Sequence, residues 1–256
     1  RPPRSTLFPY TTLFRSETPE EAAKDSDFVF TCVGNDNDLK EVAIGKKGIF
    51  NTIKKGSIYI DNTTASAKIA KELYAHAKAH DFGFLDAPVS GGQAGAENGA
   101  LTVMIGGDKK DFDKARPIID CYSKKVKLLG ASGSGQLAKM VNQICIAGLV
   151  QGLSEAINFG SNAGLKMEDV IEVISKGAAQ SWQMENRHKT MIDDKFEFGF
   201  AVDWMRKDLR IALDEAKKNN SPLPITKIVD GYYEEIQKMG GNRWDTSSLI
   251  KRFRKK

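Results

Sequence analysis

The sequence predicts an open α/β domain followed by an all-helical domain, and two observations support this prediction. From Glu17 to Leu129, short apolar runs typical of buried strands alternate with segments of helical spacing, a pattern that favours a mainly parallel sheet. After Leu129 the strand signals stop and only helical spacing continues. A Gly/Ser-rich joint over residues 130–135 separates the two parts, so we expect a domain boundary near Gly133.

The elements of the first part follow from their start and stop signals. Thr18 as N-cap with Pro19 behind it predicts a short helix through Ala23. Further helices are expected up to about residue 55, over residues 67–80 and over residues 109–119. Strands are expected over residues 27–33, 57–61, 82–86, 101–105 and 126–129.

The second part is predicted to contain only helices. A long helical run leads from the joint to about Ala163, and shorter ones cover residues 167–175, 181–193, 201–219 and 224–239. The breaks at residues 219–222 and 240–241 carry the asparagine, proline and glycine residues typical of turns.

The first sixteen residues differ from the rest of the chain. They repeat Thr-Leu-Phe at Thr6 and Thr12, interpose prolines, and match neither a strand period nor a helix face. We interpret them as a non-native extension, with a disordered native arm as the alternative. Phe8 and Phe14 are therefore not expected in the core.

The composition excludes several classes of protein. The chain has 256 residues, 41% of them hydrophobic and 28% charged, which is typical of a soluble globular protein. Its formal charge of +5 equals the five cations of residues 251–256, so we expect a near-neutral body with a solvated basic tail and no nucleic-acid partner. The longest unbroken apolar stretch, Ile144 to Val150, is too short for a membrane span. We expect a cytoplasmic protein.

Neither the cysteines nor the histidines form a metal-site pattern. The three cysteines, Cys32, Cys121 and Cys145, are far apart and never in CxxC spacing, which argues against a zinc site or a disulfide framework. His76 and His80 lie four apart on a predicted helix without a third ligand, so a solvated helix face is the preferred interpretation.

Lys139 and Asn142 lie three residues apart near the start of the long helix and project from one face. The pair could hold one hydroxyl group, and partial burial near a helix N-terminus would lower the pKa of Lys139 toward the range useful for proton transfer. The alternative from spacing alone is an exposed lysine beside a capping asparagine.

Other polar residues follow the predicted strands, where open α/β sheets place their ligand crevice. Ser90, Gly91 and Gly92 follow Asp86 and could bind an anion through exposed backbone amides, or form a plain turn. Two further segments, 33–35 and 61–64, could meet a ribose or could cap helices. On charge alone, Lys207 and Asp208 are expected on a solvated helix face.

The segment from Gly133 to Ala138 fits the letter of a dinucleotide fingerprint, G-x-G-x-x-G/A. Its context does not fit, because Glu155 lies inside the long helix and no parallel strand follows. We therefore do not expect phosphate binding there.

The chain resembles the β-hydroxyacid dehydrogenase family, the group of 3-hydroxyisobutyrate and tartronate semialdehyde dehydrogenases related to 6-phosphogluconate dehydrogenase. The resemblance runs from about Glu17 to Arg252. Three ordered motifs carry it: Asp86-Ala-Pro-Val-Ser-Gly-Gly92, Gly133-x-Gly135-x-x-x-Lys139-x-x-Asn142 and Lys207-Asp208-Leu209.

The resemblance implies a Rossmann-type α/β domain, with its N-terminal part missing, followed by an all-α 6-phosphogluconate dehydrogenase-like domain. It divides the chain into a non-native extension (1–16), a partial dinucleotide-binding domain (17–132) and a helical substrate and dimerisation domain (133–256). The implied activity is hydride transfer between NAD or NADP and a small β-hydroxy acid or its semialdehyde. The implied roles are catalysis for Lys139 and Asn142, carboxylate binding for Ser90, Gly91 and Gly92, and cofactor binding for Val33, Gly34, Asn35, Thr64 and Lys207.

One departure from the family bears on activity. The family begins with a strand, a Gly-rich phosphate turn and a helix, none of which is seen before Glu17, so we expect the chain as written to be cofactor-deficient. A non-catalytic cofactor-binding scaffold and an inactive fragment are the alternatives to an enzyme. The expected partners are a small carboxylate substrate and further copies of the chain; the sequence decides neither the substrate nor the choice between NAD and NADP.

Overall fold

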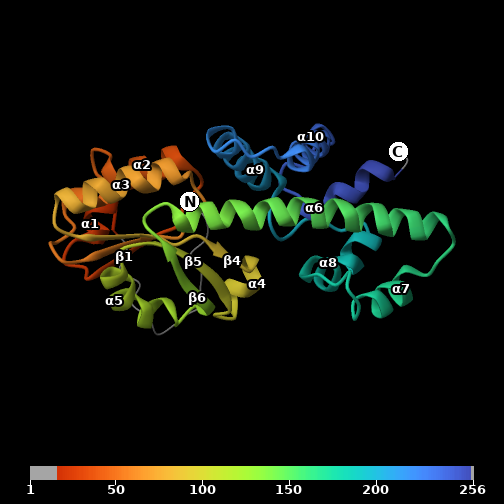
Figure 1. Cartoon of the computed structure of the whole chain (residues 1–256), viewed down its shortest axis with the longest axis horizontal. Helices are drawn as coiled ribbons and strands as arrows, with labels where there is room; N and C mark the ends of the chain where they lie inside the picture. Colours follow the sequence, from red (N-terminus) through yellow and green to blue (C-terminus); the bar gives the residue numbers. More distant parts are fainter. Residues whose placement is uncertain (1–15, 255–256) are drawn as a thin grey trace.

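The computed structural model describes residues 16–254, which form an α/β half and a helical half joined by one long helix (Figure 1). This helix, α6 (Ser134–Asn162), starts beside the sheet and runs through the helical half. The expected foreign segment, with Phe8 and Phe14, lies outside the described residues except for Ser16.

The sheet combines a parallel part with an antiparallel part. Strands β1 (Phe28–Thr31), β2 (Ile58–Asp61) and β3 (Gly83–Asp86) are parallel neighbours in this order. Strand β5 (Leu101–Gly107) then lies antiparallel to β3, and β6 (Ser123–Gly130) lies parallel to β5. The expectation of a mainly parallel sheet missed this reversal, which arises because no full-length crossover helix separates β3 from β5.

The predicted loop after Asp86 contains a short strand. Strand β4 (Val89–Ser90) pairs with β5 in the same register as β3, since Leu85 lies opposite Gly107 and Val89 opposite Val103. Strands β3 and β4 therefore extend along one side of β5, interrupted around Pro88, which lacks the N–H that a ladder bond needs. This extension leads the chain to Ser90 and Gly91 at the end of a pleated element.

Helices cover both faces of the sheet. Tyr59 and Phe84 pack with Leu39 and Leu73 on one face, while Ile60 packs in a second cluster on the other face. The covering elements are α1 (Pro19–Ala23), α2 (Asp36–Ile44), the 3-10 helix η1 (Ile49–Asn51), α3 (Ala67–Ala79), α4 (Gly92–Glu97) and α5 (Lys109–Ile119). Thr18, the predicted cap, and also Asn35 and Ser66 each accept a backbone N–H at the start of their helices.

The helical half is arranged around α6. Its other elements are α7 (Met167–Ile174), α8 (Trp182–Ile192), α9 (Val202–Lys218), α10 (Pro224–Lys238) and the 3-10 helix η2 (Thr246–Phe253). By length and composition alone α6 could cross a membrane. Here it packs against α8, α9, α10 and η2, as the core helix of a globular domain does.

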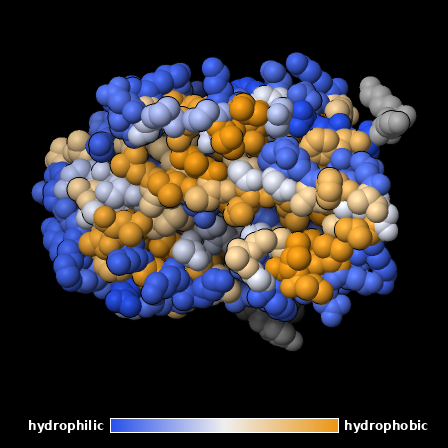
Figure 2. Space-filling view, turned by 45° about the vertical axis from the view of Figure 1, so that its right-hand side comes forward, coloured by the Kyte–Doolittle hydropathy of each residue, from blue (hydrophilic) through white to orange (hydrophobic). Residues whose placement is uncertain are grey.

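Part of the helical surface is apolar. Val141 and Phe159 of α6 and Val173 of α7 are 62%, 74% and 73% exposed. Figure 2, in which the helical half is turned forward, shows apolar residues gathered in patches between charged ones.

The C-terminal cations within the described residues, Lys251, Arg252 and Arg254, are paired with carboxylates, which for these three corrects the expectation of a free basic tail. Arg252 pairs with Glu235 and stacks on Tyr232, with 3.4 Å from its guanidinium carbon to the ring centroid. Arg254 pairs with Asp194 at 2.9 Å. The 3-10 helix η2, which the sequence analysis missed, brings these side chains back onto α8 and α10.

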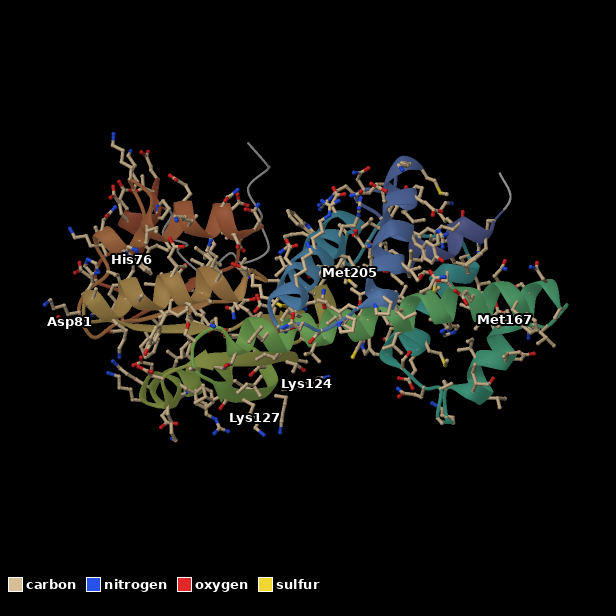
Figure 3. The ribbon with its side chains drawn as sticks, turned by 45° about the horizontal axis from the view of Figure 1, so that its top comes forward. His76, Asp81, Lys124, Lys127, Met167 and Met205 are labelled. Carbon is tan, nitrogen blue, oxygen red and sulfur yellow. The ribbon has the colours of Figure 1, made fainter. Side chains whose placement is uncertain are left out.

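The lysines of β6 lie at an edge of the sheet. Strand β6 pairs with β5 alone among the described strands, and Lys124, Lys125 and Lys127 are exposed along it. Figure 3 labels Lys124 and Lys127 on this edge strand. Charged side chains at such a position discourage pairing with another sheet, so a structural role accounts for this basic cluster.

Candidate active site

The first turn of α6 is attached to the α/β half by Asp86. This side chain is fully buried at the end of β3 and accepts backbone N–H bonds from Gly133 (2.7 Å) and Gln136 (3.0 Å). Burial raises the pKa of Asp86, and the backbone N–H groups of the helix start partly offset this rise. A carboxylate is the favoured group at a helix N-terminus, because the helix dipole is positive there.

This contact explains the Gly133-x-Gly135 pattern without a phosphate. A Cβ atom on Gly135 would lie 2.4 Å from the Met104 carbonyl oxygen and 2.6 Å from that of Asp86, so only glycine allows the approach. Gln136, also fully buried, accepts from the Ala65 N–H and donates to the Thr63 carbonyl. The N-terminus of α6 is thus occupied by protein groups, as the context of the motif predicts.

Lys139 lies one turn beyond this attachment and is 6% exposed. Burial lowers the pKa of its ammonium group; the negative charge of Asp208 opposes this shift and the positive charge of Lys207 adds to it. The lowered pKa agrees with the direction expected from the sequence. A lowered pKa is a property of lysines that transfer protons in catalysis.

Lys207 and Asp208 lie near Lys139 and not on a solvated face, which corrects the interpretation from charge alone. Asp208 is 2% exposed, and its carboxylate lies 3.1 Å from the Lys207 ammonium. Lys207 also donates to the Thr64 carbonyl after β2, which joins α9 to the sheet edge.

A series of side-chain contacts connects β4 with α9 through α6. The Ser90 hydroxyl lies 3.5 Å from Asn142 Oδ1, which is a long contact, and Asn142 Nδ2 donates to Gln143 Oε1 at 2.7 Å. Gln143 Nε2 in turn donates to Asp208 Oδ2 at 2.7 Å. Gln143 was not predicted from the sequence, because its position next to Asn142 gives no periodic signal.

Gly91 and Gly92 open the short helix α4 directly after Ser90. Their φ angles of 138° and 63° lie in the region that favours glycine. Both are exposed, and a Cβ on Gly92 would meet no atom within 4 Å. Their backbone is open to solvent beside Ser90.

The carboxyl ends of β1 and β2 are joined by side-chain contacts. The Thr63 hydroxyl accepts the Val33 N–H at 3.0 Å. Asn35 uses its side-chain oxygen to cap α2, so the capping alternative for this side chain holds. A Cβ on Gly34 would lie 3.2 Å from the ring of Trp204 on α9, which brings the helical half over this loop.

Asp61 ends β2 directly opposite Asp86 in the sheet. Its Oδ1 accepts from the Thr31 hydroxyl and the Thr63 N–H, while its Oδ2 is buried without a partner among the described residues. Burial raises the pKa of Asp61 from 3.8 to about 7, against the effect of these hydrogen bonds. The residue was predicted only as part of a polar strand end, and its burial could not be read from that pattern.

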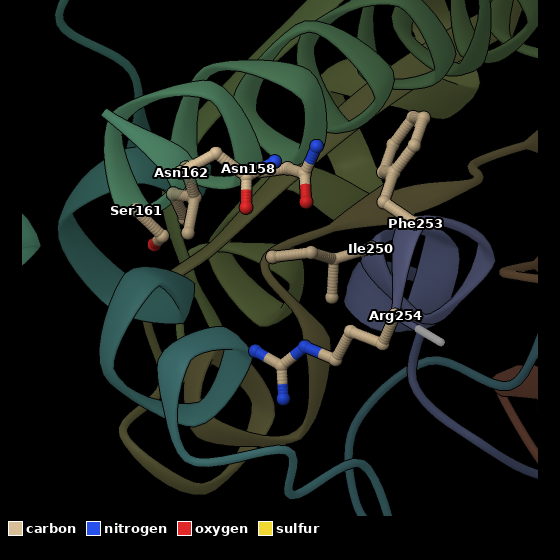
Figure 4. A pocket seen from close by; sticks show the side chains of 7 residues that line it. Asn158, Ser161, Asn162, Ile250, Phe253 and Arg254 are labelled. Carbon is tan, nitrogen blue, oxygen red and sulfur yellow. The ribbon is translucent and has the colours of Figure 1, made fainter. Parts of the chain in front are cut away.

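A separate cavity of about 580 Å³ lies at the opposite end of α6 (Figure 4). Asn158 and Asn162 of α6 face Ile250 and Arg254 there. Asn158 is roughly 28 Å from Lys139 along the helix, so this cavity lies apart from the residues around Lys139.

Two family descriptions match the chain in order. Residues 6–130 match the NAD-binding domain of 6-phosphogluconate dehydrogenase, and residues 133–253 match the NAD-binding domain of NADP-dependent 3-hydroxyisobutyrate dehydrogenase. The second match covers the segment that contains Lys139, Asn142 and Lys207.

Individual proteins agree with these matches. An uncharacterized oxidoreductase of Shewanella frigidimarina is 60% identical over 94% of this chain and 83% of its own. The 2-hydroxy-3-oxopropionate reductase of Escherichia coli is 32% identical over 91% and 80%. The crystal structure of a 3-hydroxyisobutyrate dehydrogenase from Salmonella typhimurium superposes with a TM-score of 0.83 at 29% identity, covering 91% of this chain and 82% of that one.

Proposed function

The chain belongs to the β-hydroxyacid dehydrogenase family, and we propose that it interconverts a small β-hydroxy acid and its semialdehyde with Lys139 as the proton relay. The observation that carries the proposal is the buried ammonium group of Lys139, held at the junction of the two halves beside Asp208. The proposal assigns the α/β half to the cofactor and the helical half to the substrate and to self-association.

The cofactor is NAD or NADP, and the carboxyl edge of β1 and β2 fits such a group. A Cβ at Gly34 would lie 2.5 Å from Asp38 Oδ2 and 3.2 Å from the Trp204 ring, so glycine allows this loop to lie close to α9. We propose that Val33, Gly34 and Asn35 hold the cofactor on one side and that Thr64 and Lys207 hold it on the other. The contact from Lys207 to the Thr64 carbonyl supports a shared surface.

The substrate is proposed to bind between β4 and α6. The Ser90 hydroxyl and the backbone amides of Gly91 and Gly92 suit a carboxylate, because they offer several donors and the space at Gly92 is open. Asn142 then contacts the hydroxyl or carbonyl group. These contacts orient the reacting carbon, and orientation is a large part of the rate enhancement in such reactions.

When bound, the nicotinamide supplies or accepts the hydride. Lys139 moves the accompanying proton: in the reductive direction its ammonium donates to the carbonyl oxygen, and in the oxidative direction its amine accepts the hydroxyl proton. The lowered pKa makes both forms accessible nearer neutral pH.

Two alternatives differ in their expected activity. A non-catalytic scaffold on this fold would not need a buried lysine at the junction of the two halves, so the presence of Lys139 favours an enzymatic function. An inactive fragment is tested by assaying two proteins. One is the chain itself, and the other carries a strand, a Gly-rich phosphate turn and a helix of the Rossmann type before Glu17.

The test is the oxidation or reduction of short β-hydroxy acids and semialdehydes, such as 3-hydroxyisobutyrate and tartronate semialdehyde, with NAD and NADP. In the fused protein, Lys139→Ala should lower kcat roughly 10² to 10⁴-fold and leave cofactor binding intact, because Lys139 serves only the reacting oxygen. Lys125→Ala, on the exposed edge strand, is the control. A Lys139→Ala protein with near-normal turnover on every substrate would show that this residue is not the relay.

We also propose that the protein is a homo-oligomer. The exposed Val141, Phe159 and Val173 are large apolar side chains that a second copy could cover. Light scattering coupled to size-exclusion chromatography tests this: a Phe159→Ser protein of smaller mass than the parent is the expected result, and a monomeric parent would contradict it.

A further inference from the structure

We propose that Gln143 is a positioning residue that fixes which end of the Asn142 amide faces the substrate. The inference rests on the proposed function, because it concerns the hydroxyl group that Asn142 contacts. It follows from the donor and acceptor character of three consecutive groups, Asp208, Gln143 and Asn142.

The first step is the contact between Asp208 and Gln143. An ionised carboxylate has only acceptor oxygens, so a side chain 2.7 Å from Asp208 Oδ2 must offer a hydrogen. Burial raises the pKa of Asp208, and the positive charges of Lys207, 3.1 Å away, and of Lys139 act against this rise and favour the charged form. Gln143 therefore places its NH₂ group toward α9. Because Gln143 is 1% exposed, no solvent competes for this orientation.

The second step carries the orientation to Asn142. With its NH₂ group turned to Asp208, Gln143 presents its oxygen on the other side, 2.7 Å from the amide of Asn142. Two oxygens at this distance would repel, so Asn142 must place its own NH₂ group there. The oxygen of Asn142 is left facing Ser90, whose hydroxyl is the nearest donor at 3.5 Å.

The consequence concerns the choice between the two substrates of the reaction. An amide oxygen accepts a hydrogen bond from the hydroxyl of a β-hydroxy acid, but it has nothing to donate to the carbonyl oxygen of a semialdehyde. If the Asn142 amide were reversed, the preference would be reversed as well. Gln143 thus sets which partner Asn142 favours, without touching the substrate.

The remaining charges near Lys139 do not account for this effect. The charged groups that act on Lys139 are Asp208 and Lys207, both on α9. Either one changes the charge state of the lysine, whereas the orientation of Asn142 passes through an uncharged amide. The two influences can therefore be separated by experiment.

Neutron diffraction from crystals of the perdeuterated chain tests the orientation directly and requires no activity. We expect two deuterons on the Asn142 atom that faces Gln143, and two on the Gln143 atom that faces Asp208. Deuterons on the Asn142 atom that faces Ser90 would overturn the proposal.

Kinetics of the fused active protein tests the consequence. In Gln143→Glu the new carboxylate has no hydrogen for Asp208 and is repelled by it, so the side chain has to leave this position and Asn142 loses the acceptor that orients its amide. We expect KM for the β-hydroxy acid to rise about 10- to 100-fold, the effect of losing a hydrogen bond in a desolvated site, with KM for the semialdehyde unchanged or lower. Exchanging the two groups, Gln143→Glu with Asp208→Asn, restores a donor facing an acceptor and should recover most of the loss.

Gln151→Glu is the matched control. Gln151 lies on the same helix, is 7% exposed, and donates to a carboxylate, Glu155, at 2.6 Å, but this pair forms a contact within α6. The ratio of the two KM values should not change in this variant. If both KM values rise together in Gln143→Glu, or if the double variant does not recover, Gln143 has only a structural role. A fused parent without turnover would instead refute the proposed function and leave the neutron result to decide the orientation.

Discussion

Replacing Asp61 with asparagine should flatten the pH dependence of the stability of the chain between about pH 5 and about pH 8. Asp61 is fully buried, and burial raises its pKa from 3.8 to about 7. From about pH 5 up to the folded pKa, the folded chain holds a proton on Asp61 that the unfolded chain has released. Stability must therefore fall as the pH rises toward the folded pKa.

The size of the effect follows from the two pKa values. Integrating the proton difference from about pH 5 to about pH 8 gives a loss of roughly 2.5 kcal/mol in the free energy of unfolding. Asparagine has no proton to release, so Asp61→Asn should lack this contribution. Because Oδ2 has no partner among the described residues, the new NH₂ group replaces no existing hydrogen bond.

The assay is urea unfolding of the parent and of Asp61→Asn at several pH values across this range. The difference in stability between the two proteins should move in favour of the variant by about 2.5 kcal/mol on going from the acidic to the alkaline end. Asp113→Asn, at an exposed carboxylate, is the control. Parallel curves for the parent and Asp61→Asn would refute the reasoning, whatever their absolute separation.

Two further substitutions test the packing. Gly135→Ala should destabilise the chain by at least about 3 kcal/mol in urea unfolding, because its Cβ would meet backbone oxygens at 2.4 Å and 2.6 Å. Gly148→Ala on the same helix meets no atom within 4 Å and should be neutral or stabilising by about 1 kcal/mol; equal effects of the two would contradict the docking of α6. Arg252→Ala should cost about 1 to 2 kcal/mol, since it removes the stacking on Tyr232, whereas the exposed Lys238→Ala should change little. An Arg252→Ala protein as stable as the parent would show that the packing of Arg252 does not contribute to the free energy of unfolding.

Local signals gave the elements of the fold, because caps and apolar runs act over a few residues. Thr18 caps its helix as expected, and the strand at residues 57–61 was found within one residue. The antiparallel turn of β5 and the short strand β4 could not be found in this way. They depend on which strands become neighbours, and that is decided by long-range pairing.

The site residues that belong to sequence motifs could be predicted. Those whose role depends on burial and on contacts between distant elements could not. Lys139, Asn142 and Ser90 came from motifs, and their roles remain proposals. Asp208 appeared as an exposed charge because a sequence does not show which face of α9 packs on α6. Gln143 and Asp86 act only through contacts between elements distant in sequence.

The attachment of α6 to Asp86 also affects how far the two halves are independent. A glycine-rich joint suggests modules that could be expressed apart. Here, however, cutting before Gly133 would leave the buried carboxylate of Asp86 without the backbone donors of Gly133 and Gln136. The same cut would remove both partners of Gln136. Unfolding of either half therefore weakens the other, and the two should melt as one cooperative unit despite their separate cores.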